Sequence, residues 1–584
     1  MPLPVRVARP AALAALILSL GTSAVSADSA GAYLAARAAS GANDYRAAAR
    51  YYDRLMAGAP ADLALQEAAL LAHVVLGDYD AAVKLAAGMD PSAEGSQIAA
   101  LVQLAQAAQS EDYTAGLALI AQEGDAPASA DPGALFSGLY RAWALAGQGQ
   151  MSEATRAFDE MAEEQGLGAF AAHHKALALA LVGDYEGADE ILSGPAKATV
   201  RGARRAVLAH VQILSQLERN ADAIALLDEV FADALDPQLT AIRARLEAGE
   251  PLPFTLVTSA RDGIAEVYFT IASVLASEAP GPYPLVQARL AHYLRPDHDD
   301  AALLIASLFE AQDRYDLAIE SYALVSPESP VFHASELGRA EAMVRDGRTE
   351  AAIEVLEQLS RTHPGIAGVW NALGDTLRRE DRFAEAVKAY DKAIELAGEP
   401  KPADWFVWYA RGIAEERSDA WARAEADFRK ALELSPDQPA VLNYLGYSYV
   451  EKGENLEEAL DMIQRAVAAR PDSGYIVDSL GWAYFRLGRY DEAVVQMERA
   501  VELEAVDAVL NDHLGDVYWA VGRKREAEFQ WRRAISFAPA PDLDLDRVRR
   551  KIELGLDKVL AEEGKPPLAP AVPAPKAEGG DAGN

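Results

Sequence analysis

The sequence contains no cysteine among its 584 residues. This absence excludes disulfide bonds, thiolate nucleophiles, cysteine-based zinc sites and iron–sulfur clusters. It also excludes the acylated cysteine that holds bacterial lipoproteins in a membrane. We therefore expect no direct lipid anchor of that kind.

Common catalytic motifs are missing as well. The sequence has no HExxH, GxSxG, P-loop or GxGxxG pattern. Its nine histidines concentrate only in "HH" at 173–174 and in "RPDHDD" at 295–300. Adjacent histidines diverge on a helix, and the second segment falls at the start of an expected helical repeat, where short polar residues cap helices. We predict that the protein is not an enzyme and has no metal and no cofactor.

Positive charge is scarce, because 54 basic residues face 89 acidic ones and give a formal net charge of −35. A nucleic-acid-binding protein needs a basic stripe that displaces counterions, and no dense Lys/Arg cluster occurs. An anionic membrane surface would also repel this chain on average. We therefore expect no nucleic-acid partner, and the acidic charge is explained by solubility.

The amino terminus reads "MPLPVRVARPAALAALILSLGTSAVSADSA". Arg6 and Arg9 precede an apolar stretch at 11–20, and small residues lead to Ala27. This stretch is shorter than the roughly 20 residues that cross a bilayer. The pattern is typical of a cleaved secretory signal peptide at 1–27, which predicts export to the periplasm.

A repeat of about 34 residues runs through the second half of the chain. The segment "SLGWAYFRLGRYDEA" begins at Ser479 and has counterparts on both sides. Leu-Gly pairs recur 35 and 34 residues apart, and downstream alanines recur at a spacing of 34. The residues concerned are Gly446, Gly481 and Gly515, with Ala459, Ala493 and Ala527.

These residue types suit two short antiparallel helices in close contact. Gly481 and Ala493 allow two helices to approach, because a larger side chain would overlap the partner helix. Gly488 is expected to close the first helix in a left-handed conformation. Prolines at 436, 471 and 539 are expected to stop the second helix of their repeats.

The pattern resembles the tetratricopeptide repeat family, a helix–turn–helix unit of 34 residues. Trp408, Gly412, Ala424 and Phe428 continue it upstream, and the first half carries it more weakly, with Tyr45, Tyr79 and Tyr113 spaced by 34. The resemblance implies an all-α fold, a right-handed helix–turn–helix solenoid. We expect two lobes separated by an irregular segment.

The expected domain organisation follows the repeats. It comprises a signal peptide at 1–27, degenerate repeats at 28–237, an irregular connector at 238–264, a second repeat array at 265–541, a capping helix at 542–561 and a disordered Pro/Ala-rich tail at 562–584.

The resemblance also implies a binding groove, because the first helix of each repeat lines the concave wall of such a solenoid. The partner-binding groove is predicted to contain Asn371, Asp375, Arg378, Tyr409, Asn443, Tyr444, Tyr447, Asp478, Trp482, Phe485, Asp512, Asp516 and Trp519. Such an aromatic groove edged with acid and amide suits a protein or peptide partner. Relatives that capture acidic chaperone tails use lysines and asparagines here, so the three C-terminal aspartates argue against an acidic ligand.

The C-terminal repeats resemble exported Gram-negative tetratricopeptide proteins, among them an outer-membrane lipoprotein adaptor of a periplasmic carboxyl-terminal processing protease. This implies a non-enzymatic periplasmic scaffold or adaptor that delivers clients to an envelope protease, with any membrane association made through a partner. Two alternatives stay open. One is a structural component of an envelope assembly, secretion or polysaccharide-export machine, and the other is a glycan- or peptidoglycan-binding protein.

Overall fold

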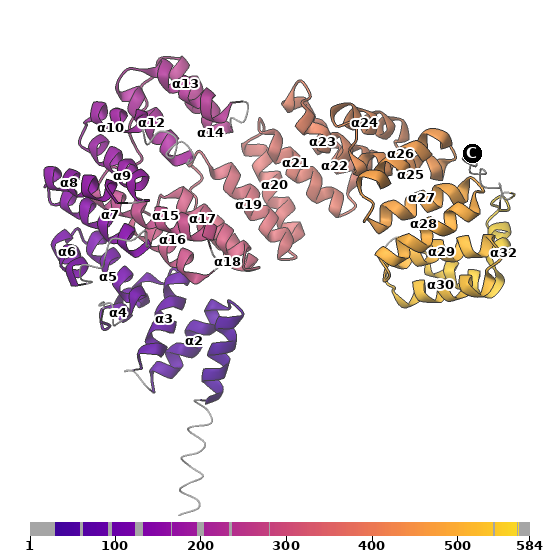
Figure 1. Cartoon of the computed structure of the whole chain (residues 1–584), viewed down its shortest axis with the longest axis horizontal. Coiled ribbons are helices and arrows are strands. Elements are labelled where there is room, and N and C mark those ends of the chain that lie inside the picture. Colours follow the sequence, from indigo (N-terminus) through magenta and orange to yellow (C-terminus); the bar gives the residue numbers. More distant parts are fainter. Residues whose placement is uncertain are drawn as a thin grey trace, which may run out of the picture. The chain divides into compact units, whose positions relative to one another are not determined.

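The structure is a computed structural model, and it describes residues 30–58, 62–90, 96–122, 132–164, 166–194, 204–232, 236–278, 281–540, 543–568 and 570. Within these ranges every regular element is a helix and no strand occurs (Figure 1). The prediction of an all-α helical repeat fold is confirmed. The predicted signal peptide at 1–27 lies outside the described residues.

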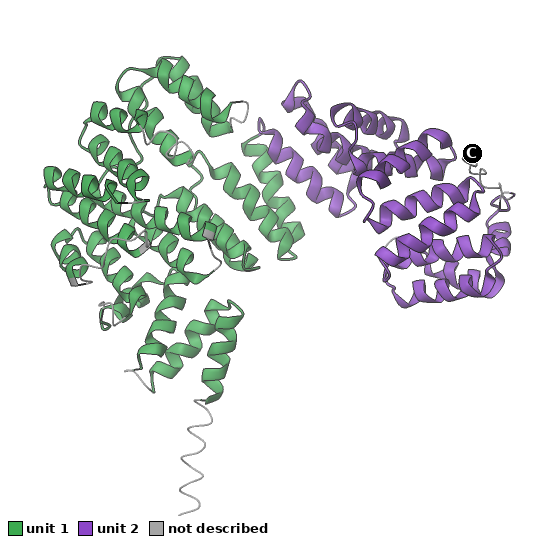
Figure 2. Cartoon of the chain, in the orientation of Figure 1, with its two compact units in different colours: residues 1–363 green, residues 364–584 purple. Residues whose placement is uncertain are grey.

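The chain forms two compact units, residues 1–363 and residues 364–584 (Figure 2). In unit 1, helical residues 30–41 are followed by a long series of helices. Their bounds are α2 Tyr45–Met56, α3 Leu63–Leu76, α4 Tyr79–Ala86, α5 Gln97–Gln109, α6 Tyr113–Gln122, α7 Pro132–Gly147, α8 Met151–Ala162, α9 Gly168–Leu181, α10 Tyr185–Ser193, α12 Arg204–Gln216, α13 Asn220–Phe231, α14 Pro237–Glu247, α15 Ala260–Glu278, α16 Pro282–Leu294, α17 Asp299–Glu310, α18 Tyr315–Tyr322, α19 Phe332–Arg345 and α20 Thr349–Thr362.

The three tyrosines spaced by 34 residues mark the same point in successive repeats of unit 1. Tyr45, Tyr79 and Tyr113 are each the first residue of a second helix, namely α2, α4 and α6. The acidic residue before each tyrosine accepts a hydrogen bond from a backbone N–H of the first helical turn, at 3.0–3.4 Å. These side chains are helix N-caps, and they fix where each second helix begins.

Helices α15 and α16 fill the inner face of the preceding repeats. They contact the first helices α3, α5, α7 and α9, which line one side of the array. Residues 262–268 of α15 are all buried, so this helix is surrounded by protein on every side. Hydrogen bonds join the layers: the Tyr268 hydroxyl donates to the Leu101 carbonyl at 2.7 Å, and Arg289 Nε donates to the Val75 carbonyl at 2.9 Å.

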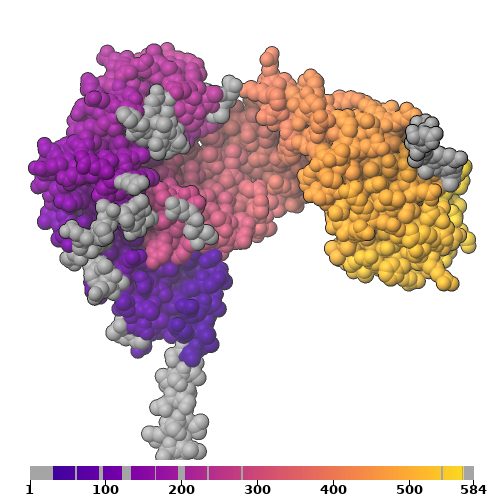
Figure 3. Space-filling model, in the orientation of Figure 1, coloured from indigo at the N-terminus to yellow at the C-terminus, as the bar shows by residue number. Residues whose placement is uncertain are grey.

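The first repeat of unit 1 is also held by distant helices. Arg46 forms ion pairs with Asp316 and Glu320 of α18, and the Tyr45 hydroxyl donates to Gln312 Oε1 at 2.8 Å. In the space-filling view the indigo residues near the start of the chain lie directly against the pink residues after 300 (Figure 3). The repeats of unit 1 therefore close on α15–α18 and leave no open inner face over α3–α9 in the described residues.

The division into units lies elsewhere than expected. The sequence predicts an irregular connector at 238–264, but α14 occupies Pro237–Glu247, and the segment before α15 is hydrogen-bonded to α12 through Gln212 and Thr255. Because α15 and α16 pack into the preceding repeats, both sides of this segment belong to unit 1. The chain divides after residue 363 instead.

The described residues of unit 2 form five helix pairs and a C-terminal helical cap. The bounds are α21 Ala367–Arg379, α22 Phe383–Ala397, η1 Pro402–Asp404, α23 Trp405–Glu416, α24 Trp421–Leu434, α25 Pro439–Lys452, α26 Leu456–Ala469, α27 Gly474–Arg486, α28 Tyr490–Leu503, α29 Ala508–Ala520, α30 Lys524–Ser536, α31 Leu545–Leu554 and α32 Leu556–Glu562.

The repeated glycine of each first helix makes room for a large side chain of the second helix. A Cβ atom on Gly481 would lie 2.8 Å from Met497 Cγ, and one on Gly515 would lie 2.4 Å from Trp531 Nε1. Gly374, Gly412 and Gly446 stand in the same relation to Tyr390, Phe428 and Ile463. Gly488 has a φ of 72° after α27, so the predicted left-handed helix end is confirmed.

The end of the chain differs from the expected single capping helix at 542–561. Helices α31 and α32 are separated at Gly555, which has a φ of 84°. Both belong to the hydrophobic core of unit 2 through buried Val548 and Leu556. Most of the predicted tail at 562–584 lies outside the described residues, but Leu568 packs against the same core.

Candidate functional site

The first helices of unit 2 present one stripe of partly exposed side chains. Neighbouring first helices contact one another along α21, α23, α25, α27 and α29, with α23 and α25 joined through Tyr444, which contacts Tyr409 and Glu416. On α27 the residues that reach the surface are Tyr475, Trp482 and Arg486, at the spacing of one helix face. The corresponding positions of α23 and α25 add further aromatics. We call this surface the open face and define it by Phe406, Tyr444, Tyr447, Tyr475 and Trp482.

One half of the open face is an aromatic cluster on α23 and α25. The Tyr409 ring lies 6.0 Å from those of Phe428 and Tyr444 and 6.3 Å from that of Phe406. Burial raises the pKa of Tyr409 to about 12, and the nearby Tyr475 hydroxyl contributes in the same direction. The cluster is therefore neutral near pH 7, and it offers ring faces and edges for contact with a partner.

The other half is built around Trp482. Its indole stacks on Phe485 and on His513, with ring centroids 4.8 and 4.2 Å apart. Its Nε1–H donates to Glu451 Oε1 of the preceding first helix, and Arg486 lies 3.3 Å from the same oxygen. Trp482 is thus held in one orientation, whereas Phe485 is buried and belongs to the packing between helices.

A buried ion pair lies beneath the Trp482 indole. His513 Nδ1 is 2.9 Å from Asp478 Oδ2. Burial by itself would lower the pKa of His513, but the carboxylates of Asp478, Asp512 and Asp516 outweigh it and raise that pKa. When it is protonated, the imidazole stacked on Trp482 adds a cation–π contact. This arrangement links α27 to α29 and supports Trp482 from below.

The polar residues predicted for the groove lie mainly between helices. Asn443 is 8% exposed and Asp478 is 4% exposed. On α21, Asp375 accepts a hydrogen bond from the Tyr390 hydroxyl at 2.7 Å, while Arg378 Nε donates to that hydroxyl at 3.2 Å. Asn371, one turn earlier, is half-buried. Asp375 and Arg378 thus hold the paired helix α22, and Asn443 and Asp478 are enclosed between helices.

The last three predicted groove residues are covered by the C-terminal helices. Lys551 of α31 is fully buried, and its Nζ lies 2.6 Å from Asp512 Oδ1 and 2.7 Å from Asp516 Oδ1. Trp531 Nε1–H also donates to Asp516 Oδ1, at 2.9 Å. Trp519 Nε1–H donates to Asp557 of α32, and its ring fills the space beside Gly555. The open face therefore ends at α27 and His513.

This burial changes the expected charge of the site. Asp478, Asp512 and Asp516 argued against an acidic ligand, but all three are buried and paired with basic groups. At the surface, the ends of first helices carry Arg417 and Arg486 instead. The argument against acidic partners therefore does not hold for the open face.

Two exposed aromatic residues were missed by sequence reasoning. Phe406 is 44% exposed and Tyr475 is 51% exposed, in the first turns of α23 and α27. Both hold the same position in the repeat as Ala440 of α25, since the spacings are 34 and 35 residues. This position in the repeat can be identified from the sequence, and a search for aromatic residues there would have found both Phe406 and Tyr475.

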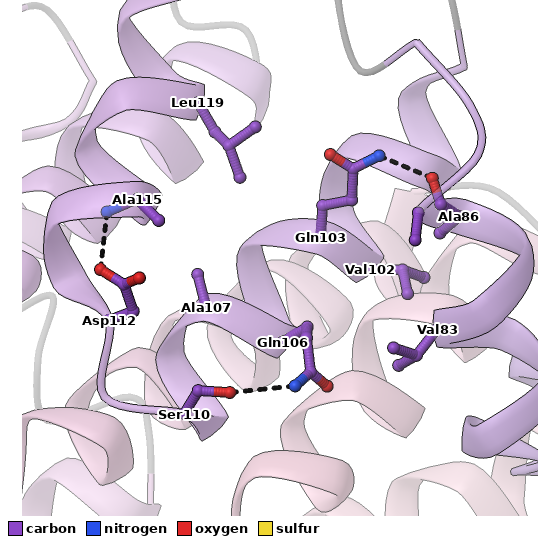
Figure 4. A pocket seen from close by; sticks show the side chains of 11 residues that line it. Val83, Ala86, Val102, Gln103, Gln106, Ala107, Ser110, Asp112, Ala115 and Leu119 are labelled. Atoms are coloured by element: carbon purple, nitrogen blue, oxygen red, sulfur yellow. Dashed lines mark hydrogen bonds between the residues drawn. The ribbon is translucent and has the colours of Figure 1, made fainter.

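Unit 1 has a separate hollow of about 400 Å³ between α4, α5 and α6 (Figure 4). Its walls are mainly small and apolar, with Val83, Val102 and Leu119 among them. The polar groups at its rim are bonded within the chain: Gln106 Nε2 donates to Ser110 Oγ at 3.0 Å, and Asp112 caps α6. The hollow therefore presents no cluster of unpaired polar groups.

The histidines singled out in the sequence have structural positions. His174 Nδ1 accepts from Trp143 Nε1–H at 3.0 Å, and His298 Nδ1 accepts from the Ala301 backbone N–H at 3.1 Å, as the N-cap of α17. Throughout the described ranges, no group of three or more His, Asp or Glu side chains is arranged to hold a metal ion. No helix in those ranges has the length and apolar character needed to span a bilayer.

A family model for the tetratricopeptide repeat matches this chain at residues 337–404, 372–439, 409–474 and 445–508. The matched segment, residues 337–508, is similar to tetratricopeptide repeats and runs from the end of unit 1 through most of unit 2. These matches include all five residues of the open face.

Two curated relatives are similar to parts of the chain. A TPR repeat-containing protein of Pseudomonas aeruginosa is 25% identical over 196 residues, which are 33% of this chain and 32% of the relative. The small glutamine-rich tetratricopeptide repeat-containing protein 2 of Mycosarcoma maydis is 34% identical over 85 residues, 14% and 23% of the two chains. The chain thus spans about a third or less of the length of these relatives.

Solved structures of similar chains include a tetratricopeptide repeat protein from Parabacteroides merdae, with 17% identity and a TM-score of 0.37 over 44% of this chain and 98% of that one. The Cut9–Hcn1 assembly of the APC/C gives 15% identity and a TM-score of 0.36, over 79% and 96%.

Proposed function

We propose that the protein is a non-enzymatic scaffold that binds an extended segment of a partner protein along the open face of unit 2. One observation carries the proposal. The same kind of first-helix face is filled by α15 and α16 in unit 1, whereas on α23, α25 and α27 it presents aromatic rings to solvent. Exposed aromatics supply large contact areas at low entropic cost, and they are enriched in binding hot spots.

The chemistry of the open face suits a partner with apolar or aromatic side chains. Phe406 and Tyr475 present the largest exposed ring surfaces on these first helices. Trp482 and Tyr444 are held by hydrogen bonds to Glu451 and Glu416, so little rotamer freedom is lost when a partner binds. Arg417 and Arg486 add positive charge at one end of the helices.

The cellular part of the proposal rests on the amino terminus and on the resemblance of the C-terminal repeats. A cleaved signal peptide at 1–27 would place the scaffold in the periplasm. There it would deliver client proteins to an envelope protease, and any association with a membrane would be made through that partner. A fixed position in an envelope assembly is the competing role, in which the open face holds a permanent neighbour.

The test is recovery of partners by the mature chain, residues 28–584, from a periplasmic extract. The double variant Phe406→Ala/Tyr475→Ala removes two exposed rings and leaves the buried aromatic cluster in place. We expect a defined set of proteins to be lost with this variant and retained with Tyr283→Ala, which removes a ring of similar exposure from unit 1. Equal recovery by both variants would refute binding at the open face.

A photo-crosslinking amino acid at position 475 then identifies the segment bound there. Crosslinks to a protease or its substrates support delivery, and crosslinks to one stoichiometric neighbour support a fixed assembly. Calorimetry with peptidoglycan fragments separates the glycan alternative, because stacking of sugar rings on Tyr475 would give heat that the double variant lacks.

A further inference from the structure

The outer side of α30 carries an exposed phenylalanine between two arginines. Phe529 is 59% exposed, and Arg525 and Arg532 lie on the same helical stripe, four residues before it and three after it. Both arginines are exposed and form no ion pair with other described residues. An unpaired basic stripe around an apolar centre is unusual in a chain with a net charge of −35.

The outer side of α28 carries the complementary pattern. Val495 is 60% exposed, and the exposed acidic residues Asp491 and Glu502 lie on the same stripe, four residues before it and seven after it. Neither carboxylate forms an ion pair within the described residues. Leu503, at the end of this helix, and Val506, in the next turn, extend the exposed apolar surface.

The two stripes occupy the same position in successive repeats. Val495 and Phe529 each lie two residues after the repeated alanine, Ala493 or Ala527, that faces the first helix. They therefore share the outer side of unit 2, away from the open face. One side of this patch is acidic, the other is basic, and apolar side chains lie at the centre of both.

We infer that unit 2 forms a symmetric dimer with a second copy of this chain through the outer sides of α28 and α30. Helices α28 and α30 occupy the same place in successive repeats and run in the same direction, so a two-fold axis that brings their outer sides together lies along the helices. It places α28 of one protomer parallel to α30 of its partner, and it makes the same contact twice. With 1.5 Å of rise per residue, Asp491 lies about 6 Å before the Val495 level and Arg525 about 6 Å before the Phe529 level, so their charges meet.

The same arrangement brings Arg532 towards the acidic end of α28. Glu498, at the level of Arg532, is paired with Arg523 of its own chain at 2.8 Å, whereas Glu502 lies about 6 Å further along α28 and is left to meet Arg532. Arg499 lies on the same side, but its guanidinium donates to the Pro471 carbonyl at 2.6 Å and is directed towards its own repeat. Complementary charges therefore surround both apolar contacts.

A second copy fits this patch better than another class of partner. An acidic protein or an anionic membrane would match α30 but would be repelled by Asp491 and Glu502, and a basic partner would match only α28. Two helix stripes bury less than a standard interface, so we expect dissociation constants in the micromolar range. The dimer would carry two open faces, one on each protomer, and would bind two copies of a partner at once, whatever that partner is.

Sedimentation velocity of residues 28–584 over a wide concentration range tests this inference. We expect a monomer–dimer equilibrium that weakens with added salt, because the charged contacts are exposed. Arg525→Glu/Arg532→Glu makes both stripes acidic, and Asp491→Arg/Glu502→Arg makes both basic. Each variant alone should raise the dissociation constant at least tenfold.

The mixture of the two variants is the decisive arm. Their stripes are complementary to each other, so an equimolar mixture should form a heterodimer as tight as the unaltered homodimer. Glu454→Arg/Glu457→Arg, an equal charge change at exposed positions before and at the start of α26, should leave dimerisation unchanged. A chain that stays monomeric, variants that dimerise normally, or a mixture that stays monomeric would overturn the inference.

Discussion

The cap of unit 2 depends on one buried lysine, and its replacement gives a sharp test. Lys551 is fully buried between Asp512 and Asp516, which are themselves 8% and 1% exposed. The variant Lys551→Met keeps the length of the side chain and removes its charge. It leaves two buried carboxylates without their shared ammonium partner, and breaking a buried ion pair in this way costs about 3–5 kcal/mol.

The loss of stability in Lys551→Met can also be calculated from the free energy of protonating one of the two carboxylates. Asp516 keeps the hydrogen bond from Trp531, so Asp512 is the carboxyl that must take up a proton. Burial already raises the pKa of Asp512 above its ordinary value of 3.8. Protonating a carboxyl of pKa 3.8 costs about 4 kcal/mol at pH 7 and about 2 kcal/mol at pH 5, at 1.36 kcal/mol per unit. The variant should therefore be less destabilised at pH 5 than at pH 7.

The assay is urea unfolding of residues 28–584 at both pH values, with hydrogen exchange of α31 and α32 as a local readout. We expect the free energy of unfolding of unit 2 to fall by about 3–4 kcal/mol at pH 7. Lys558→Met, at an exposed position of α32, is the matched control and should change it by less than about 0.5 kcal/mol.

Two results would refute this reasoning. One is a loss below about 1 kcal/mol at pH 7, which would mean that the carboxylates do not depend on Lys551. The other is an equal loss at both pH values, because an uncompensated carboxylate must become less costly as protons are added. The double variant Lys551→Met/Asp512→Asn should recover most of the stability in either buffer.

Two further predictions concern unit 1. Gly263→Ala should destabilise it by about 2–3 kcal/mol in thermal unfolding, because the new Cβ would lie 2.2 Å from the buried Trp143 ring, whereas Gly31→Ala, with nothing within 4 Å, should be close to neutral. His174 is fully buried, and burial lowers its pKa to about 3. The folded state then binds fewer protons than the unfolded state below pH 6.5, so stability is complete above pH 6.5 and falls by about 1.4 kcal/mol per unit as the pH decreases towards 3. Urea unfolding at pH 7.5 and pH 5 should show a smaller pH dependence for His174→Gln than for the unaltered chain, and an unchanged pH dependence would contradict this assignment.

The repeat period predicts the helices of unit 2 well, because it reports contacts within one helix pair. Gly481 is a glycine because Met497 of the paired helix occupies the space beside it. The Leu-Gly pairs, the repeated alanines and the prolines all record such contacts, and they lie within about 20 residues of each other. In unit 1 the large packing residues of the repeat are often replaced by alanine. There the N-cap aspartates before Tyr45 and Tyr79 still mark the repeat, because each bonds the first turn of its own helix.

The choice of groove residues is less predictable, because it depends on the tilt between neighbouring repeats. Asn443 and Tyr444 are adjacent in the sequence, yet the first is buried between helices and the second reaches the open face. Adjacent residues point about 100° apart around a helix axis, so the angle between repeats decides which of the two is buried, and no local pattern fixes that angle. The same limit explains why Asp478 was expected at the surface and is instead bonded to His513.

The packing of α15 and α16 against the first helices of unit 1 is harder still to predict from a local sequence pattern. Tyr268 donates to the Leu101 carbonyl across 167 residues, and Arg289 donates to the Val75 carbonyl across 214. One sequence feature does point to it: α15 is apolar around most of its circumference near Ile264–Tyr268, apart from Glu266, whose charge is paired with Arg205. A repeat helix needs one polar side, and a helix without one has to be enclosed.

The two units therefore use one repeat in two ways. In unit 1 the first helices bury their inner side on α15 and α16, which gives those repeats a core of their own and leaves no surface there for an extended ligand. In unit 2 the first helices contact their neighbours through buried polar residues such as Asp478 and keep aromatic rings at the surface. Because a buried aromatic stabilises the fold and an exposed one does not, folding leaves the presence of Phe406 and Tyr475 on these first helices unexplained. Binding of a partner would give these residues a role, and for this reason the proposed function is placed on unit 2.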